Sequence, residues 1–101
     1  MQEENNTISL HYKKLGQGPP LLILHGLFGS LDNWQTIANG LADQFTIYLI
    51  DLRNHGKSPH QPLMNYHLMA QDLVRFVHAH NLREVNIIGH SMGGKVVMEL
   101  L

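Results

Sequence analysis

Residues 85–94 read VNIIGHSMGG. A short, mostly apolar run ends at Ile88, and Gly89 and Gly93 then flank Ser91 at two residues' distance on either side. A Gly-x-Ser-x-Gly run that follows a strand and opens a helix is typical of a sharp turn that presents a serine hydroxyl at the end of a sheet. The stretch therefore predicts a strand, a tight turn with Ser91 at its tip, and a helix.

Such a turn, a nucleophile elbow, is suited to acyl transfer. A serine hydroxyl is a weak nucleophile until it is held in position and relieved of its proton by a base. The elbow supplies the position through a strained backbone, and the two glycines leave room where a β-carbon would clash. Since the next helix begins at the serine, the amide of Met92 is the first candidate to hold a developing oxyanion.

A second oxyanion donor is expected from the loop after an earlier strand. Residues 21–24 form a continuous apolar run, as in a strand buried on both faces, and HGLFG follows at residues 25–29. The amide of Leu27 is the candidate there. Each such amide lowers an acyl-transfer barrier by about 3 kcal/mol.

The rest of the pattern indicates an α/β fold with a mostly parallel sheet. Alternation or apolar runs predict strands at residues 7–13, 21–24, 45–50 and 85–88, and helical spacing predicts helices that begin near residues 32–33, 65 and 95. Strands that alternate with helices form parallel βαβ units, and their sites lie beyond the carboxyl ends of the strands. The loops after residues 24 and 88 should therefore converge.

Two helix starts are predicted from capping residues. Asp32 or Asn33 is expected to cap the first helix, and Asn65 the second. The second helix carries a predicted core stripe of Tyr66, Met69, Ala70, Leu73, Phe76 and Val77.

Composition narrows the class of protein. With 101 residues the chain forms one domain at most, and its 7 basic and 8 acidic side chains favour neither nucleic acid nor an anionic membrane as partner. No cysteine is present for disulfides or thiolate metal sites. The polar start and the absence of a long apolar run favour a cytoplasmic protein with no membrane segment.

Other polar residues have structural interpretations. His25 and His55 are expected to shape loops, His90 to project away from Ser91, and Asp51 and Arg53 to brace a loop by hydrogen bonds. His78 and His80 lie two apart on a predicted helix, hence on opposing faces, which argues against a metal site. The glycines at 16, 18 and 56 fit neither a dinucleotide fingerprint nor a phosphate-binding loop.

Three blocks of sequence resemble the α/β-hydrolase superfamily: HGLFGS at residues 25–30, DLRNHGKS at 51–58 and GHSMGG at 89–94. Their details resemble the bacterial short-chain esterase and acyl-thioesterase branch. The resemblance implies a cofactor-free and metal-free Ser-Asp-His hydrolase of small acyl esters or thioesters, with Ser91 as nucleophile and the amides of Leu27 and Met92 as the oxyanion hole.

The resemblance also implies that residues 1–101 are the N-terminal portion of one α/β-hydrolase domain, truncated after the elbow. The family's catalytic acid, histidine and lid follow later in the sequence. Family strand order places residues 21–24 between the other parallel strands and leaves residues 85–88 with an open edge, which is an aggregation hazard. We expect the isolated chain to be poorly stable and inactive. The open alternatives are a lyase or acyltransferase on the same scaffold, and a non-catalytic protein or binding module.

Overall fold

The computed structural model describes residues 7–26 and 29–100 of the chain. Its strands are β1 (Tyr12–Gly16), β2 (Pro20–Leu24), β3 (Thr46–Ile50) and β4 (Asn86–Gly89). Its helices are the short 3-10 helix η2 (Leu31–Trp34) and the α-helices α1 (Gln35–Leu41), α2 (Tyr66–Ala79) and α3 (Met92–Leu100). This is the predicted α/β class.

The four strands form one mixed sheet in the order β1-β3-β2-β4. β2 pairs in parallel with both β3 and β4, whereas β1 pairs antiparallel with β3. The predicted central position of β2 is confirmed, and in the described residues β4 is an edge strand. Since β2 and β4 run in parallel, their carboxyl ends and the loops that follow them meet at one edge of the sheet.

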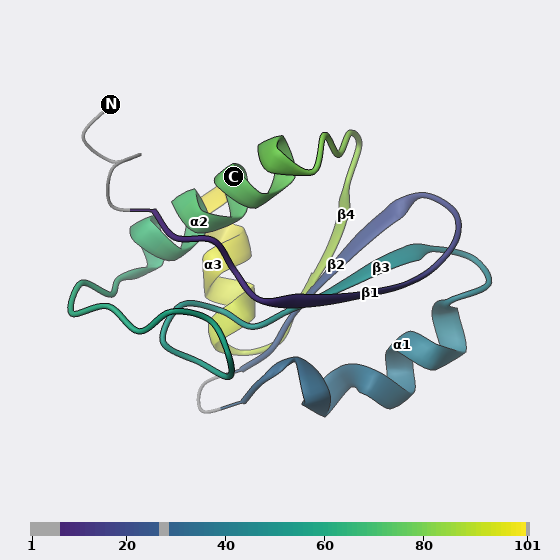
Figure 1. The fold of residues 1–101 in the computed structure, drawn as a ribbon, viewed down its shortest axis with the longest axis horizontal. Helices are drawn as coiled ribbons and strands as arrows, with labels where there is room; N and C mark the ends of the chain where they lie inside the picture. Colours follow the sequence, from purple (N-terminus) through teal and green to yellow (C-terminus); the bar gives the residue numbers. More distant parts are fainter. Residues whose placement is uncertain (1–6, 27–28, 101) are drawn as a thin grey trace.

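Helices cover both faces of this sheet, with α1 on one side and α2 and α3 on the other (Figure 1). Alternate residues of β2 point to opposite faces: Leu22 and Leu24 pack toward α2 and α3, whereas Leu21 and Ile23 pack toward α1. β2 is therefore buried on both of its faces, as the continuous apolar run at 21–24 predicted.

The first strand begins later than predicted. Residues 7–11 lie outside the sheet, although Ile8 and Leu10 are buried. The Ile8 amide donates to the Asp72 carboxylate, and the His11 amide donates to the Ser58 hydroxyl. The alternation at 7–13 therefore marks one buried face, but the Ile8 and His11 amides are bonded to side chains, and the His11 carbonyl accepts from the Asp51 amide just after β3 (2.9 Å).

Two of the predicted helix starts are wrong, and one is confirmed. Ser30, not Asp32 or Asn33, caps η2, and the Asn33 side chain accepts a hydrogen bond from the Ser30 amide. α3 begins at Met92, as the elbow pattern predicted, and not at residue 95 as the helical spacing predicted, and it contains Gly93 and Gly94. Asn65 caps α2 as predicted, since its side chain accepts from the Leu68 amide.

The predicted core stripe on α2 packs into the core except at its first residue, Tyr66. Met69, Ala70, Leu73 and Phe76 are buried, and Val77 is partly buried. Tyr66 is 40% exposed, and the Lys95 ammonium lies 5.7 Å from its ring centroid.

Candidate active site

Ser91 lies in a sharp turn between β4 and α3. Its backbone is left-handed, with φ 55°, and its side chain is exposed. The His90 amide donates to the Leu24 carbonyl (3.1 Å), which holds the turn against β2, and the Lys95 amide donates to the Ser91 carbonyl (3.2 Å). A left-handed serine costs about 1–2 kcal/mol, so the surrounding contacts must hold it there.

The flanking glycines permit this turn for reasons that the structure makes explicit. A β-carbon on Gly89 would lie 2.6 Å from the Gly93 carbonyl oxygen. One on Gly93 would lie 2.6 Å from the Leu24 carbonyl oxygen and 2.8 Å from that of His25. The spacing of Gly-x-Ser-x-Gly therefore lets α3 approach the ends of β2 and β4 at backbone contact.

The loops after β2 and β4 converge as predicted. A β-carbon on Gly26 would lie 3.4 Å from the Ser91 β-carbon, so the start of the loop after β2 lies beside the serine. Leu27, the predicted second oxyanion donor, lies outside the described residues.

Met92 is the first residue of α3, and its side chain is buried. The first amides of a helix have no acceptor within it, and they carry the positive end of the helix dipole. The Met92 amide therefore lies at the positive end of the α3 dipole, next to Ser91 in the chain.

No hydrogen bond reaches the Ser91 hydroxyl from any residue in the described part of the chain. The neighbouring ring of His90 packs on Trp34, with 5.7 Å between ring centroids, on the side of the sheet that carries α1. It borders an open hollow lined by Gly26, Gly29, Asn33, Trp34 and Ile37. As predicted, His90 is directed away from the serine rather than paired with it.

His25 is buried beside the candidate site and joins two loops. Its Nε2 accepts from the Leu52 amide (3.0 Å), and its Nδ1 lies 2.7 Å from the Gly26 carbonyl oxygen. Burial lowers the pKa of His25 below its ordinary value of 6.5, and the hydrogen bond to the Gly26 carbonyl opposes this effect in part. The His25 ring also contacts His55, whose Nδ1 lies 2.8 Å from the Arg53 carbonyl oxygen.

Asp51 braces the loop after β3, as predicted. Its carboxylate accepts the Lys57 amide (2.9 Å), and its carbonyl accepts the Ser58 hydroxyl. Gly56 has φ 52°, and a β-carbon there would collide with the Asp51 carboxylate. These contacts place Asp51 within the loop rather than at the serine.

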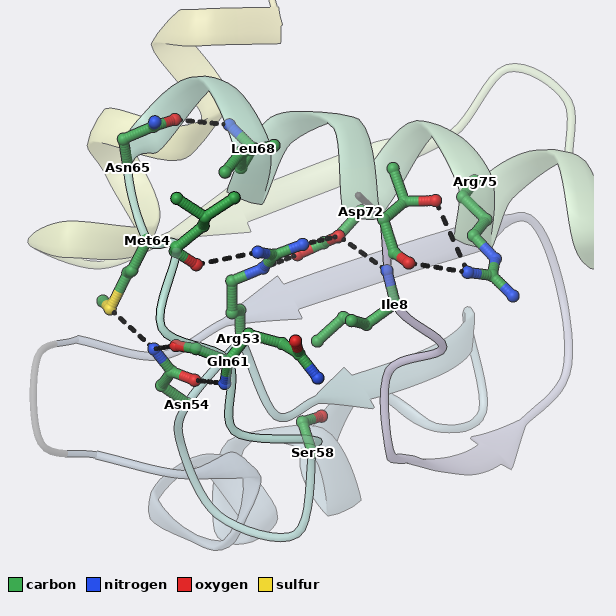
Figure 2. Close-up of polar contacts among 12 residues, drawn as sticks. Ile8, Arg53, Asn54, Ser58, Gln61, Met64, Asn65, Leu68, Asp72 and Arg75 are labelled. Atoms are coloured by element: carbon green, nitrogen blue, oxygen red, sulfur yellow. Dashed lines mark hydrogen bonds and ion pairs between the residues drawn. The ribbon is translucent and has the colours of Figure 1, made fainter. Parts of the chain in front are cut away.

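Arg53 forms a buried ion pair with Asp72 of α2, which the sequence reasoning did not anticipate (Figure 2). Two hydrogen bonds of 2.9 Å join the guanidinium and the carboxylate, whose side chains are 0% and 1% exposed. Arg53 also donates to the Leu63 carbonyl. The available signal was the position of Asp72, because a carboxylate between Met69 and Phe76 on an apolar helix face requires a buried partner.

The described residues contain neither a cluster of metal-binding side chains nor a membrane-spanning helix. Residues 7–26 and 29–100 contain no group of three or more His, Cys, Asp or Glu side chains that could hold a metal ion. None of the helices in these ranges has the length and apolar character needed to cross a bilayer.

The family assignment follows from comparison with known proteins. Residues 19–101 match the model of the alpha/beta hydrolase fold family. The chain belongs to this family. The α/β-hydrolase fold predicted from the three sequence blocks is thereby confirmed.

Similar proteins include esterases and an acyltransferase. The chain is 52% identical over 81 residues to the esterase YbfF of Escherichia coli K12, covering 80% of this chain and 32% of that protein. It is 48% identical over 88 residues to a probable alcohol acetyltransferase of Saccharomyces cerevisiae, covering 82% of this chain and 26% of that protein. A solved marine microorganism esterase is 57% identical with a TM-score of 0.91, covering 93% of this chain and 36% of that structure. The chain thus spans about a quarter to a third of the length of these relatives.

Proposed function

We propose that this α/β-hydrolase chain carries the nucleophile and the oxyanion hole of a serine hydrolase that acts on small acyl esters or thioesters. The observation that supports this most directly is the left-handed Ser91, exposed between β4 and α3 and adjacent to Gly26 of the loop after β2. The names of the esterase relatives support the same reaction class.

In the proposed reaction, the Ser91 oxygen attacks the acyl carbon while a base takes its proton. The carbonyl π electrons move to the oxygen, and the Met92 and Leu27 amides hold the resulting oxyanion. Collapse of this intermediate breaks the carbon–oxygen or carbon–sulfur bond, and the leaving group takes the proton from the base. Water then repeats the sequence on acyl-Ser91 and releases the acid. Each amide contributes about 3 kcal/mol to transition-state stabilisation.

We expect the base and its acid partner to lie in a part of the polypeptide that corresponds to the segments of the relatives that this chain does not cover. Within the described residues the Ser91 hydroxyl has no hydrogen-bond partner, and His25, His55 and His90 have other contacts. We therefore expect the 101-residue chain alone to be inactive, as a nucleophile without a base is weak.

A second candidate function is acyl transfer to an alcohol. The similarity to a probable alcohol acetyltransferase favours it, as the acyl-Ser91 intermediate would be the same and an alcohol would replace water in the second step. The ratio of transfer to hydrolysis, measured with an acyl ester in the presence of a small alcohol, distinguishes the two.

The test is covalent labelling of Ser91 in the complete polypeptide that carries this sequence. A fluorophosphonate probe should modify Ser91, identified by peptide mass spectrometry, and S91A should abolish both labelling and hydrolysis of short-chain oxyesters and thioesters. S9A is the matched control, because Ser9 is exposed on the segment before β1, where its hydroxyl accepts from Arg75. Unchanged ester hydrolysis by S91A would refute the proposal.

A further inference from the structure

We propose that the hollow between α1 and the elbow is a substrate subsite that takes a bulky, uncharged hydrocarbon group of the ester or thioester. The inference rests on the proposed function, because it gives the reaction at Ser91 a selectivity for one class of substrate. Six described residues line this subsite: Gly26, Gly29, Asn33, Trp34, Ile37 and His90.

The hollow lies directly beside the proposed nucleophile. Of its lining residues, His90 precedes Ser91 in the chain, and Gly26 lies next to both. A β-carbon on Gly26 would be 3.4 Å from the Ser91 β-carbon and 3.6 Å from the His90 Nδ1. Because glycine has no side chain, nothing from Gly26 separates the hollow from Ser91. A group attached to the reacting ester or thioester can therefore extend from Ser91 into the hollow.

The walls of the hollow are largely apolar. Trp34 packs against the core beneath α1, and its ring lies 5.7 Å from that of His90, between centroids. Ile37 follows one turn later and is 47% exposed. The Asn33 Oδ1 accepts the Ser30 amide (2.8 Å). The hollow is thus bordered by a tryptophan ring and a branched side chain that a hydrocarbon group can cover.

The lining also selects against charged groups. None of the six lining residues is an acid, a lysine or an arginine. A carboxylate or an ammonium group that entered would lose water without gaining a counter-charge, which is costly. An uncharged hydrocarbon group would instead gain contact with Trp34 and Ile37, and it would remove apolar surface from water.

The size of the hollow indicates how large this group is. Its volume is about 350 Å³. An apolar cavity of about 150 Å³ is large enough to bind benzene. A phenyl or cyclohexyl group therefore fits, whereas a methyl group leaves most of the hollow to water. Such a group can belong to the acyl part of the substrate or to its alcohol part, and the kinetic experiment below distinguishes the two.

Binding to the hollow can be measured by fluorescence, because Trp34 is the only tryptophan of the chain. Titration of the chain with cyclohexylmethanol should change the Trp34 emission to saturation. Methanol should not, and the cyclohexanecarboxylate anion should bind at least about tenfold more weakly than cyclohexylmethanol. No saturable change, or equal binding of the anion, would overturn the proposal.

A matched pair of variants ties this binding to the wall of the hollow. I37D places a carboxylate on the wall and should weaken the binding of cyclohexylmethanol about tenfold or more. T36D adds the same charge to the neighbouring residue of α1, which is exposed but does not line the hollow, and should bind as the unmodified chain does. Because both positions are exposed, neither change disturbs the core. Equal weakening by the two variants would contradict the assignment.

Kinetics of the complete polypeptide connect the hollow to substrate choice. The substrates are ethyl cyclohexanecarboxylate, cyclohexylmethyl acetate and ethyl acetate. I37D should lower kcat/KM about tenfold or more for one of the two cyclohexyl esters, and less than about twofold for ethyl acetate. The ester that is affected identifies whether the acyl or the alcohol part occupies the hollow. An equal loss for all three esters, or a loss for none, would overturn the proposal.

The two proposals fail in different ways. If the fluorophosphonate probe does not label Ser91, the proposed function fails, while the Trp34 titration still decides whether the hollow binds a hydrocarbon group. If Ser91 is labelled and I37D keeps the unmodified preference among the three esters, the subsite fails alone.

Discussion

Replacement of Asp72 by asparagine tests the buried ion pair on which the loop after β3 depends. In D72N the side chain keeps its size, but Arg53 loses its counter-charge at a site where both side chains are at most 1% exposed. Arginine cannot release its proton, so the buried cation remains, and one amide N–H of the new side chain faces the guanidinium donors. The bond from the Ile8 amide to the Asp72 carboxylate is also weakened, because a charged acceptor is lost.

The expected loss is large for a chain of this size. Removal of one partner of a buried pair costs about 3–5 kcal/mol, against a total stability of about 5–15 kcal/mol for a typical domain. A loss of about 4 kcal/mol lowers the Tm by roughly 15–30 °C for a domain of about 100 residues. Loss of this network would also weaken the bond from Arg53 to the Leu63 carbonyl. It would release the Ile8 amide from Asp72 of α2 (Figure 2).

Urea unfolding followed by far-UV circular dichroism measures this loss, with the slope on denaturant compared between variants. D32N is the matched control, because the Lys13–Asp32 pair has the same 2.9 Å length but lies at the surface, with side chains 51% and 73% exposed. The double variant R53M/D72L should be more stable than D72N, since it removes the buried guanidinium together with its counter-charge. A loss below about 1 kcal/mol in D72N, or one matched by D32N, would refute the reasoning.

Three further predictions concern the elbow, the pH dependence and the sheet edge. G93A should destabilise the fold by about 1–3 kcal/mol, because its β-carbon would lie 2.6 Å from the Leu24 carbonyl oxygen of β2. G40A should stabilise α1 by about 0.5–1 kcal/mol, because a β-carbon there meets no atom within 4 Å. Thermal unfolding that ranks the two variants in the opposite order would contradict this account. Burial lowers the pKa of His25 below 6.5, so near that pH the unfolded chain binds a proton that the folded chain does not. The free energy of unfolding should therefore fall as the pH drops below about 6.5, and it should fall by less in H25Q. Equal slopes of unfolding free energy against pH in the two proteins would contradict this. I88K places a charge on the edge strand β4, where Ile88 is 36% exposed, and should reduce light scattering by the concentrated chain, whereas the same change at Ile37 of α1 should not.

Local chemistry explains what could be predicted from the sequence. The continuous apolar run at 21–24 is typical of a strand buried on both faces, and the structure confirms it. Asn65 could cap a helix because its side chain reaches the amide of Leu68, three residues later in the chain. Gly89 and Gly93 permit the turn because a β-carbon at either position would lie 2.6 Å from a carbonyl oxygen, and Ser91 takes the left-handed conformation between them. Strand order and the convergence of two loops followed from the general behaviour of parallel βαβ units and from family resemblance.

Contacts between distant residues decided the rest. Asp72 meets Arg53 across 19 positions and Ile8 across 64, and no periodicity in the sequence records such a pairing. The same contacts keep residues 7–11 out of the sheet despite their alternation, because the Asp72 and Ser58 side chains accept the amides of Ile8 and His11. The His25 ring accepts from the Leu52 amide, 27 positions away in the chain. The sequence by itself determined the three parallel strands, the turn at Ser91 and the start of α2, because those preferences are local. The partner of each buried charge and imidazole became fixed only when the packed sheet brought the segments together.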